Sequence, residues 1–152
     1  MKKLSIGLCC SLFLLVGCSG SKISETVCSQ TRGENKEMKD ETIIAYDGDD
    51  VTSITYKTKV FTEKAVSDVG IDDLEAYAKD TKKALKDSAD VKYTYEIKDK
   101  TFSDSLRVDI TKDNIDDLKD KGLVNMYLGK DGELLKSKDM IKYIEDAGKK
   151  CK

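Results

Sequence analysis

Two pairs of segments with a period of two constrain the fold of this chain more than any other feature. Apolar and polar residues alternate from Val91 to Lys98, and the alternation resumes from Leu106 to Thr111. An earlier pair, residues 42–46 and 51–60, flanks the turn sequence Asp47-Gly48-Asp49-Asp50. Because successive side chains of a strand point to opposite faces, this alternation predicts strands that are buried on one face only. Each pair is therefore predicted to form an antiparallel hairpin.

Helical spacing separates the two hairpins and also follows the second one. Between residues 71 and 88, apolar residues recur three or four positions apart, with acids first and lysines later, which predicts an amphipathic helix. A short helical turn is expected at 113–118, and Ser137 is expected to cap a last helix that ends before Gly148. The segment around residues 25–37 is a candidate for a further strand. The predicted fold class is α+β, a two-layer antiparallel sheet of two hairpins packed against a central helix and a C-terminal helix.

Residues 1–17 have the features of a secretory signal peptide that is removed after export. Lys2 and Lys3 precede an almost uninterrupted apolar stretch that ends at Gly17. That stretch is too short to cross the roughly 30 Å hydrocarbon core of a bilayer as a permanent helix. The chain is therefore expected to be exported rather than to span the membrane.

The end of this stretch predicts a lipid anchor. Leu15-Val16-Gly17-Cys18 resembles the bacterial lipobox, in which an aliphatic residue and two small or medium residues precede a cysteine. By this resemblance Cys18 is lipidated and holds the protein on the outer side of a membrane of the cell envelope. The alternative is an ordinary signal peptide followed by a chance cysteine. Residues 18–27 are then expected to form a lipidated terminus and tether, and residues 28–152 a single α+β domain.

The five cysteines fall into three groups. Cys9 and Cys10 leave with the predicted signal peptide, Cys18 is the predicted lipid attachment site, and Cys28 and Cys151 remain. A remaining pair in an exported domain predicts a disulfide, while two unpaired thiols are the alternative. No metal site is predicted, because two separate cysteines in a chain without histidine do not supply a tetrahedral zinc site.

Composition excludes several classes of function. The chain has no His and no Trp, so the commonest general base and the favoured aromatic platform for sugars are both missing. Without Lys2 and Lys3, 25 basic and 29 acidic side chains are left and lie interspersed, which gives no case for binding nucleic acid. The Asp-Gly pairs at 47–48 and 131–132 lack the ligand spacing of a calcium loop and predict tight turns. No cofactor is predicted.

Several short motifs together resemble one family. They are the lipobox, the early hairpin turn Tyr46-Asp47-Gly48-Asp49-Asp50-Val51-Thr52, the central helix, the tyrosine-rich second hairpin, and Lys136-Ser137-Lys138 with Ile141 in the terminal helix. This arrangement resembles the YehR-like bacterial lipoproteins. The resemblance implies an α+β fold and a membrane address, and it implies no particular chemistry. The Cys28/Cys151 pair is not implied by it.

These features favour a non-catalytic binding or interaction module of the cell envelope over an enzyme. The partner, an envelope protein or ligand, is not identified by the sequence. The alternative function is a small carboxylate-dependent hydrolase of an envelope polymer, which a concave, partly buried pair of carboxylates would favour. A candidate partner face follows from the alternation, because it places these lysines on the polar side of the sheet: Lys57, Lys59, Lys92 and Lys98. The alternative interpretation of these lysines is a solvated face without a partner.

Overall fold

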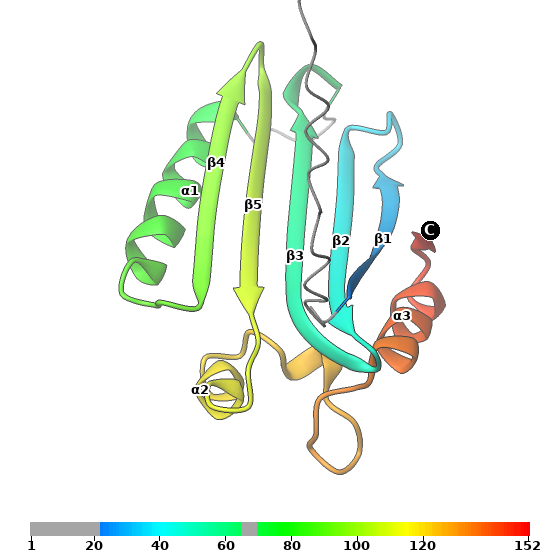
Figure 1. The fold of residues 1–152 in the computed structure, drawn as a ribbon. Coiled ribbons are helices and arrows are strands. Elements are labelled where there is room, and N and C mark those ends of the chain that lie inside the picture. Colours follow the sequence, from blue (N-terminus) through cyan, green and yellow to red (C-terminus); the bar gives the residue numbers. More distant parts are fainter. Residues whose placement is uncertain (1–21, 65–69) are drawn as a thin grey trace, which may run out of the picture.

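The computed structural model of this protein describes residues 22–64 and 70–152. The predicted signal peptide, Cys18 and the first residues of the predicted tether lie outside these residues. The described part forms one antiparallel sheet with helices on one face (Figure 1).

The sheet has six strands in the order β4-β5-β3-β2-β1-β6. Every neighbouring pair is antiparallel. Both predicted hairpins are present, as β2–β3 and β4–β5. The strands are β1 (Ile23–Arg32), β2 (Met38–Asp47), β3 (Asp50–Phe61), β4 (Val91–Lys98), β5 (Thr101–Asp109) and β6 (Lys150–Cys151).

The helices cover the apolar face of the sheet in two places. Helix α1 buries Ala78 against Tyr93 and Phe102, whereas α3 buries Met140 and Ile144 in a second cluster over β1 and β2. Figure 1 shows α1 beside β4, α3 beside β1, and α2 below the end of β5. The helices are α1 (Ile71–Leu85), α2 (Ile115–Asp120) and α3 (Ser137–Asp146), with 3₁₀ turns at Thr62–Lys64 and Asn125–Tyr127.

The α+β class is confirmed, but three strands begin earlier than predicted. Strand β2 begins at Met38 rather than at Thr42. Strand β1 begins at Ile23, so residues 23–27, predicted as tether, pair with β2. Strand β5 begins at Thr101 rather than near Leu106. In β1 the helix-side residues Ser24 and Thr26 are small or polar. In β5 Asp104, opposite Tyr95, interrupts the apolar helix-side series between Phe102 and Leu106. Hydrogen bonding to the neighbouring strands, β2 for β1 and β3 for β5, sets these bounds.

Candidate binding face and pocket

The four predicted partner-face lysines lie on the side of the sheet away from the helices. Lys57 and Lys59 point to the same face of β3 as Thr55. Thr55 is the cross-strand partner of Arg107, and Arg107 is the partner of Lys92 in β4. Lys98 pairs with Thr101, and Thr101 pairs with Phe61. Phe61 is an even number of positions from Lys57 and Lys59, so it points to the same face of β3. The structure therefore brings all four to one surface, which we call the open face. All four are exposed.

The central part of the open face is rich in cations. In the cross-strand rows that run from Lys92 to Lys98 of β4, only Glu41 and Glu96 carry negative charge. Within the described residues no ion pair is formed by Lys57, Lys92 or Lys98. The cationic side chains in these rows are Lys39, Lys57, Lys59, Lys92, Lys98, Arg107 and, at the β6 edge, Lys150.

Two pairs of like charges stand directly opposite each other on the open face. Lys92 of β4 is the cross-strand partner of Arg107, and Lys39 of β2 is the partner of Lys59. Like charges in such positions destabilise a sheet, because their Cβ atoms lie only about 4.5–5.5 Å apart. Each pair has one neighbouring acid: Lys39 binds Glu41 at 2.8 Å and Arg107 binds Asp109 at 2.8 Å. The hydrogen bond from Lys39 lowers the pKa of Glu41.

A shallow pocket of about 450 Å³ lies on the open face beside the first of these pairs. Three hydroxyl side chains, Thr55, Thr94 and Ser105, line it together with the cations. Hydroxyl groups and cations are the side chains that bind phosphate and carboxylate oxygens. Its remaining lining residues are Glu25, Ile43, Lys57, Lys92 and Arg107. The arrangement is suited to an anion.

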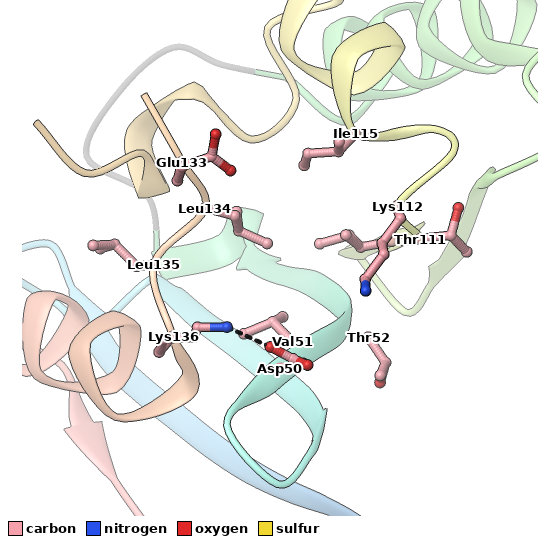
Figure 2. Close-up of a pocket in the computed structure, with 11 residues that line it drawn as sticks. Asp50, Val51, Thr52, Thr111, Lys112, Ile115, Glu133, Leu134, Leu135 and Lys136 are labelled. Atoms are coloured by element: carbon pink, nitrogen blue, oxygen red, sulfur yellow. Dashed lines mark hydrogen bonds and ion pairs between the residues drawn. The ribbon is translucent and has the colours of Figure 1, made fainter. Parts of the chain in front are cut away.

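A second pocket, of about 280 Å³, lies at the end of the sheet where the β2–β3 turn meets α2 and the segment before α3 (Figure 2). Apolar side chains form most of it: Val51, Ile110, Ile115, Leu134 and Leu135. Four charged side chains also line it, namely Asp50, Lys112, Glu133 and Lys136. Sequence reasoning missed this pocket, because its walls come from separate parts of the chain and no local pattern connects them.

A buried carboxylate, Asp40, and a half-buried one, Asp104, lie on the helix side of the sheet. Asp104 accepts a hydrogen bond of 3.1 Å from the Tyr93 hydroxyl, and burial raises the pKa of Asp104 despite this bond. Asp40 forms an ion pair with Arg32 and is 6% exposed. Each carboxylate thus has a partner within the fold, which is the arrangement expected of structural groups.

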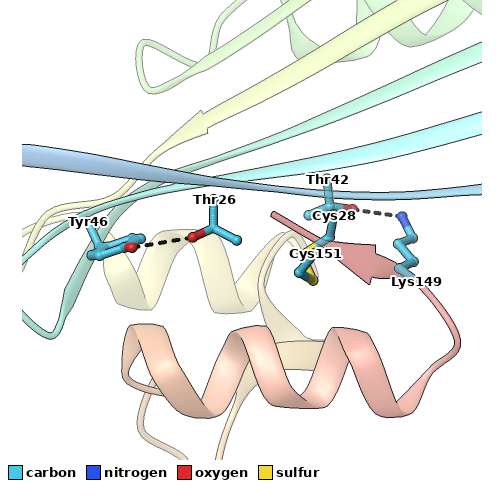
Figure 3. Close-up of a disulfide and its surroundings, with 6 residues drawn as sticks. All are labelled: Thr26, Cys28, Thr42, Tyr46, Lys149 and Cys151. Carbon is cyan, nitrogen blue, oxygen red and sulfur yellow. Dashed lines mark hydrogen bonds between the residues drawn. A yellow bond between two sulfur atoms is a disulfide. The ribbon is translucent and has the colours of Figure 1, made fainter.

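The cysteine pair joins the two ends of the domain (Figure 3). Cys28 and Cys151 are cross-strand partners on β1 and β6, with Cα atoms 3.9 Å apart. The next residues, Val27 and Lys152, exchange two backbone hydrogen bonds of 3.1 and 3.0 Å. The cysteines therefore occupy a non-hydrogen-bonded position, where side chains of antiparallel strands come closest. The disulfide predicted from the sequence agrees with this geometry.

Lys149 lies beside this disulfide. Its ammonium group donates a 2.8 Å hydrogen bond to the Thr42 hydroxyl, as Figure 3 shows. Burial lowers the pKa of Lys149, and the nearby charge of Asp40 partly opposes this shift. The group therefore helps to close the sheet at the C-terminus.

In the part of the chain that the structure describes, no group of three or more cysteine, aspartate or glutamate side chains is placed to hold a metal ion. None of the helices in residues 22–64 and 70–152 is long and apolar enough to cross a membrane.

Comparisons with known proteins give likeness at the level of structure. No protein-family model matches the chain, and no curated protein matches it. The chain is similar to the NMR structure of the YehR protein of E. coli, with 17% identity, a TM-score of 0.65, and coverage of 87% of this chain and 92% of that one. It is also similar to the NMR structure of a protein from Streptococcus pneumoniae, with 16% identity, a TM-score of 0.50, and coverage of 100% and 98%.

At these identities the likeness shows the fold alone. The lipoprotein part of the resemblance found in the sequence concerns residues outside the described ranges and stays a prediction. The chain therefore has a YehR-like α+β fold.

Proposed function

We propose that this protein is a bacterial envelope lipoprotein, anchored through Cys18, whose domain binds a phosphate-bearing component of the envelope without catalysis. The anchor rests on the lipobox and the apolar segment before it. The binding function rests on the open face, to which the sheet brings the predicted lysines.

The opposed like charges carry this proposal. A sheet selected only for stability would place opposite charges at Lys92/Arg107 and Lys39/Lys59, since opposite-charge pairs contribute roughly 0.2–1 kcal/mol and like-charge pairs destabilise. A phosphate placed between two such cations would remove their repulsion and gain charge-assisted hydrogen bonds. Glu41 and Asp109 each bind one member of a pair and offset part of this repulsion in the free protein, and a bound phosphate would offset the rest.

The test is a charge reversal on the open face. We expect the double variant Lys92→Glu and Lys98→Glu of the unlipidated chain to lose retention on isolated envelopes. Its melting temperature should stay the same or rise slightly, because Glu at 92 would stand opposite Arg107. The matched control is Lys83→Glu with Lys130→Glu, which changes the net charge equally at two exposed positions away from this face.

The outcome also depends on salt. Retention of the wild-type chain should fall as ionic strength rises, since exposed charges are screened over about 10 Å at 0.1 M salt. A parallel measurement on phosphatidylglycerol vesicles separates a lipid headgroup from a phosphate polymer of the envelope. Equal retention of the open-face variant and its control would show that this face is not the binding surface.

The anchor has its own test. Cys18→Ala should abolish incorporation of a fatty-acyl label and processing at the predicted site, because the thiol that receives the lipid is gone. A variant that still carries the label would refute the lipobox assignment.

One observation favours the hydrolase alternative, namely the raised pKa of the half-buried Asp104. If Asp104 acted as a general acid, Asp104→Asn would abolish any clearing of envelope suspensions by the purified protein while leaving the fold intact. We expect no clearing by the wild-type chain or the variant, because the Tyr93 hydroxyl already donates a hydrogen bond to the Asp104 carboxylate.

A further inference from the structure

The pocket in Figure 2 has an apolar interior and a charged mouth on one side. Leu134 and Ile115 face each other across it, with Val51 at its base. At the mouth, Lys136 binds Asp50 at 2.6 Å. Lys112 also lies near Asp50, where its positive charge contributes to lowering the pKa of that carboxyl after the larger effect of Lys136. Figure 2 places Glu133 on the far side of the pocket from this group.

Contacts within the fold connect the walls of the pocket. On one side, Leu128 and Leu134 form a β-bridge, and the Ser137 amide donates to the Asp49 carbonyl at 2.9 Å. On the other side, the Asn114 side chain accepts from the Thr111 amide at 2.8 Å and donates to the Asp109 carbonyl at 2.9 Å. A preformed site needs little ordering when a ligand binds. These contacts make the pocket a fixed feature of the fold.

The charges at the mouth indicate what kind of ligand fits. Two cations, Lys112 and Lys136, lie near Asp50, and Asp50 first and then Asp49 raise the pKa of Lys136. Lys136 is thus already paired, whereas Lys112 forms no ion pair within the described residues. The ammonium group of Lys112 is therefore available on this side of an apolar cavity. The volume of about 280 Å³ lies just below the usual range for pockets of drug-sized ligands, about 300–1,000 Å³, and suits a smaller molecule. We propose that this pocket binds a medium-chain fatty carboxylate, with its tail between Leu134 and Ile115 and its carboxylate at Lys112.

The position of the pocket is consistent with a ligand that comes from a membrane, and this step rests on the proposed anchor. Ile23 at the start of β1 pairs with Asp47, and Asp47 pairs with Asp50 at the pocket mouth. Two inter-strand spacings amount to about 10 Å. Four residues lie between Cys18 and Ile23, so the five steps of chain from one to the other span at most about 18 Å. An anchored domain would thus hold this pocket near the bilayer surface.

The test uses the unlipidated chain from residue 18 to 152 with Cys18→Ser, which retains every strand and helix described above. Amide chemical shifts are followed by NMR during titration with octanoate, octylammonium or octanol. We expect octanoate to shift the amides of Leu134, Leu135 and Ile115 saturably and to bind more tightly than the other two probes.

Two substitutions of the exposed Lys112 sharpen the test without disturbing the core. Lys112→Met should weaken octanoate binding about twofold to fivefold, the effect of losing one exposed ion pair, and leave octanol unchanged. Lys112→Glu should make octylammonium the preferred probe. Lys83→Met on α1 is the matched control and should bind octanoate as the wild type does.

Some results would overturn the proposal. They are octanoate shifts outside the pocket, equal binding of the three probes, or no effect of either Lys112 substitution. None of these results bears on envelope retention by the open face, because the titration involves neither the anchor nor that surface. Failure here is therefore distinguishable from failure of the proposed function.

Discussion

Removing the disulfide tests how the ends of this domain are held together. The bond joins β6, a strand of two residues, to β1 across 123 positions of chain. In the chain-entropy model a cross-link over this separation stabilises the folded state by about 4.9 kcal/mol at 25 °C, because it restricts the unfolded chain. Measured effects are often smaller than this model gives, so we expect Cys28→Ala with Cys151→Ala to lose about 2–5 kcal/mol.

The assay is an equilibrium urea titration in which circular dichroism monitors unfolding. The reduced wild-type chain is the matched control, since it keeps both sulfur atoms and loses only the bond. This control is needed because Cys28 is fully buried and truncation to Ala also removes packing. Both chains should keep the fold, because all buried members of the two core clusters belong to elements other than β6, and Cys151 only packs against the edge of one cluster.

Hydrogen exchange locates the effect. The amides of Val27 and Lys152, which bond to each other across β1 and β6, should lose protection first in the reduced chain. The protection of the β3 amides should fall only as much as the free energy of global unfolding falls. A loss below about 1 kcal/mol in both the reduced chain and the double variant would refute the loop-entropy reasoning, and unchanged protection at Val27 would show that β6 is held by other contacts.

Three further predictions concern the core and the turns. Phe102→Ala should lower the free energy of unfolding by about 3–5 kcal/mol in a urea titration, since Phe102 is 2% exposed in the cluster under α1. Asp104→Asn should change how stability depends on pH. Burial raises the pKa of Asp104 in the folded state, so its contribution to the free energy of unfolding falls as pH rises from its ordinary pKa near 3.9 through the raised one. Urea midpoints should therefore fall less between pH 4 and 7 in the variant than in the wild type. Gly132→Ala should cost about 1 kcal/mol because Gly132 has a φ of +79°, although no atom lies within 4 Å of the added methyl group, and thermal unfolding measures this loss.

The predictable part of the fold is the part where side-chain chemistry follows the backbone period. Val91, Tyr93 and Tyr95 alternate with polar residues, so the β4–β5 hairpin was predicted from the sequence. The first half of β5 and the start of β1 were not predicted as strands. Asp104 and Thr26 point toward the helix side there, where strand periodicity calls for an apolar residue. Each has a tertiary partner there: Asp104 bonds to Tyr93, and Thr26 lies 3.3 Å from the hydroxyl of Tyr46. Partners so far apart in sequence leave no local pattern.

The same limit applies to the candidate sites. Alternation within a strand was enough to place Lys57, Lys59, Lys92 and Lys98 on one face. It did not predict that Lys92 stands opposite Arg107, because register between strands depends on turns and on the packing of the other face. The second pocket was wholly hidden, since Val51, Ile115 and Leu134 meet only through tertiary folding.

Net charge is a poor guide to the partner of such a sheet. The chain as a whole carries more acids than bases, which argues against an anionic partner when the charges are only counted. A strand, however, sends neighbouring residues to opposite faces, so a chain with interspersed charges can still concentrate cations on one surface. On the open face Lys92, Arg107 and Lys57 lie within one or two cross-strand rows, a separation shorter than the screening length at 0.1 M salt. At close range the attraction of these cations for an anion exceeds the screened repulsion from acids elsewhere on the protein. The salt dependence of binding should therefore decrease when lysines of the open face are removed.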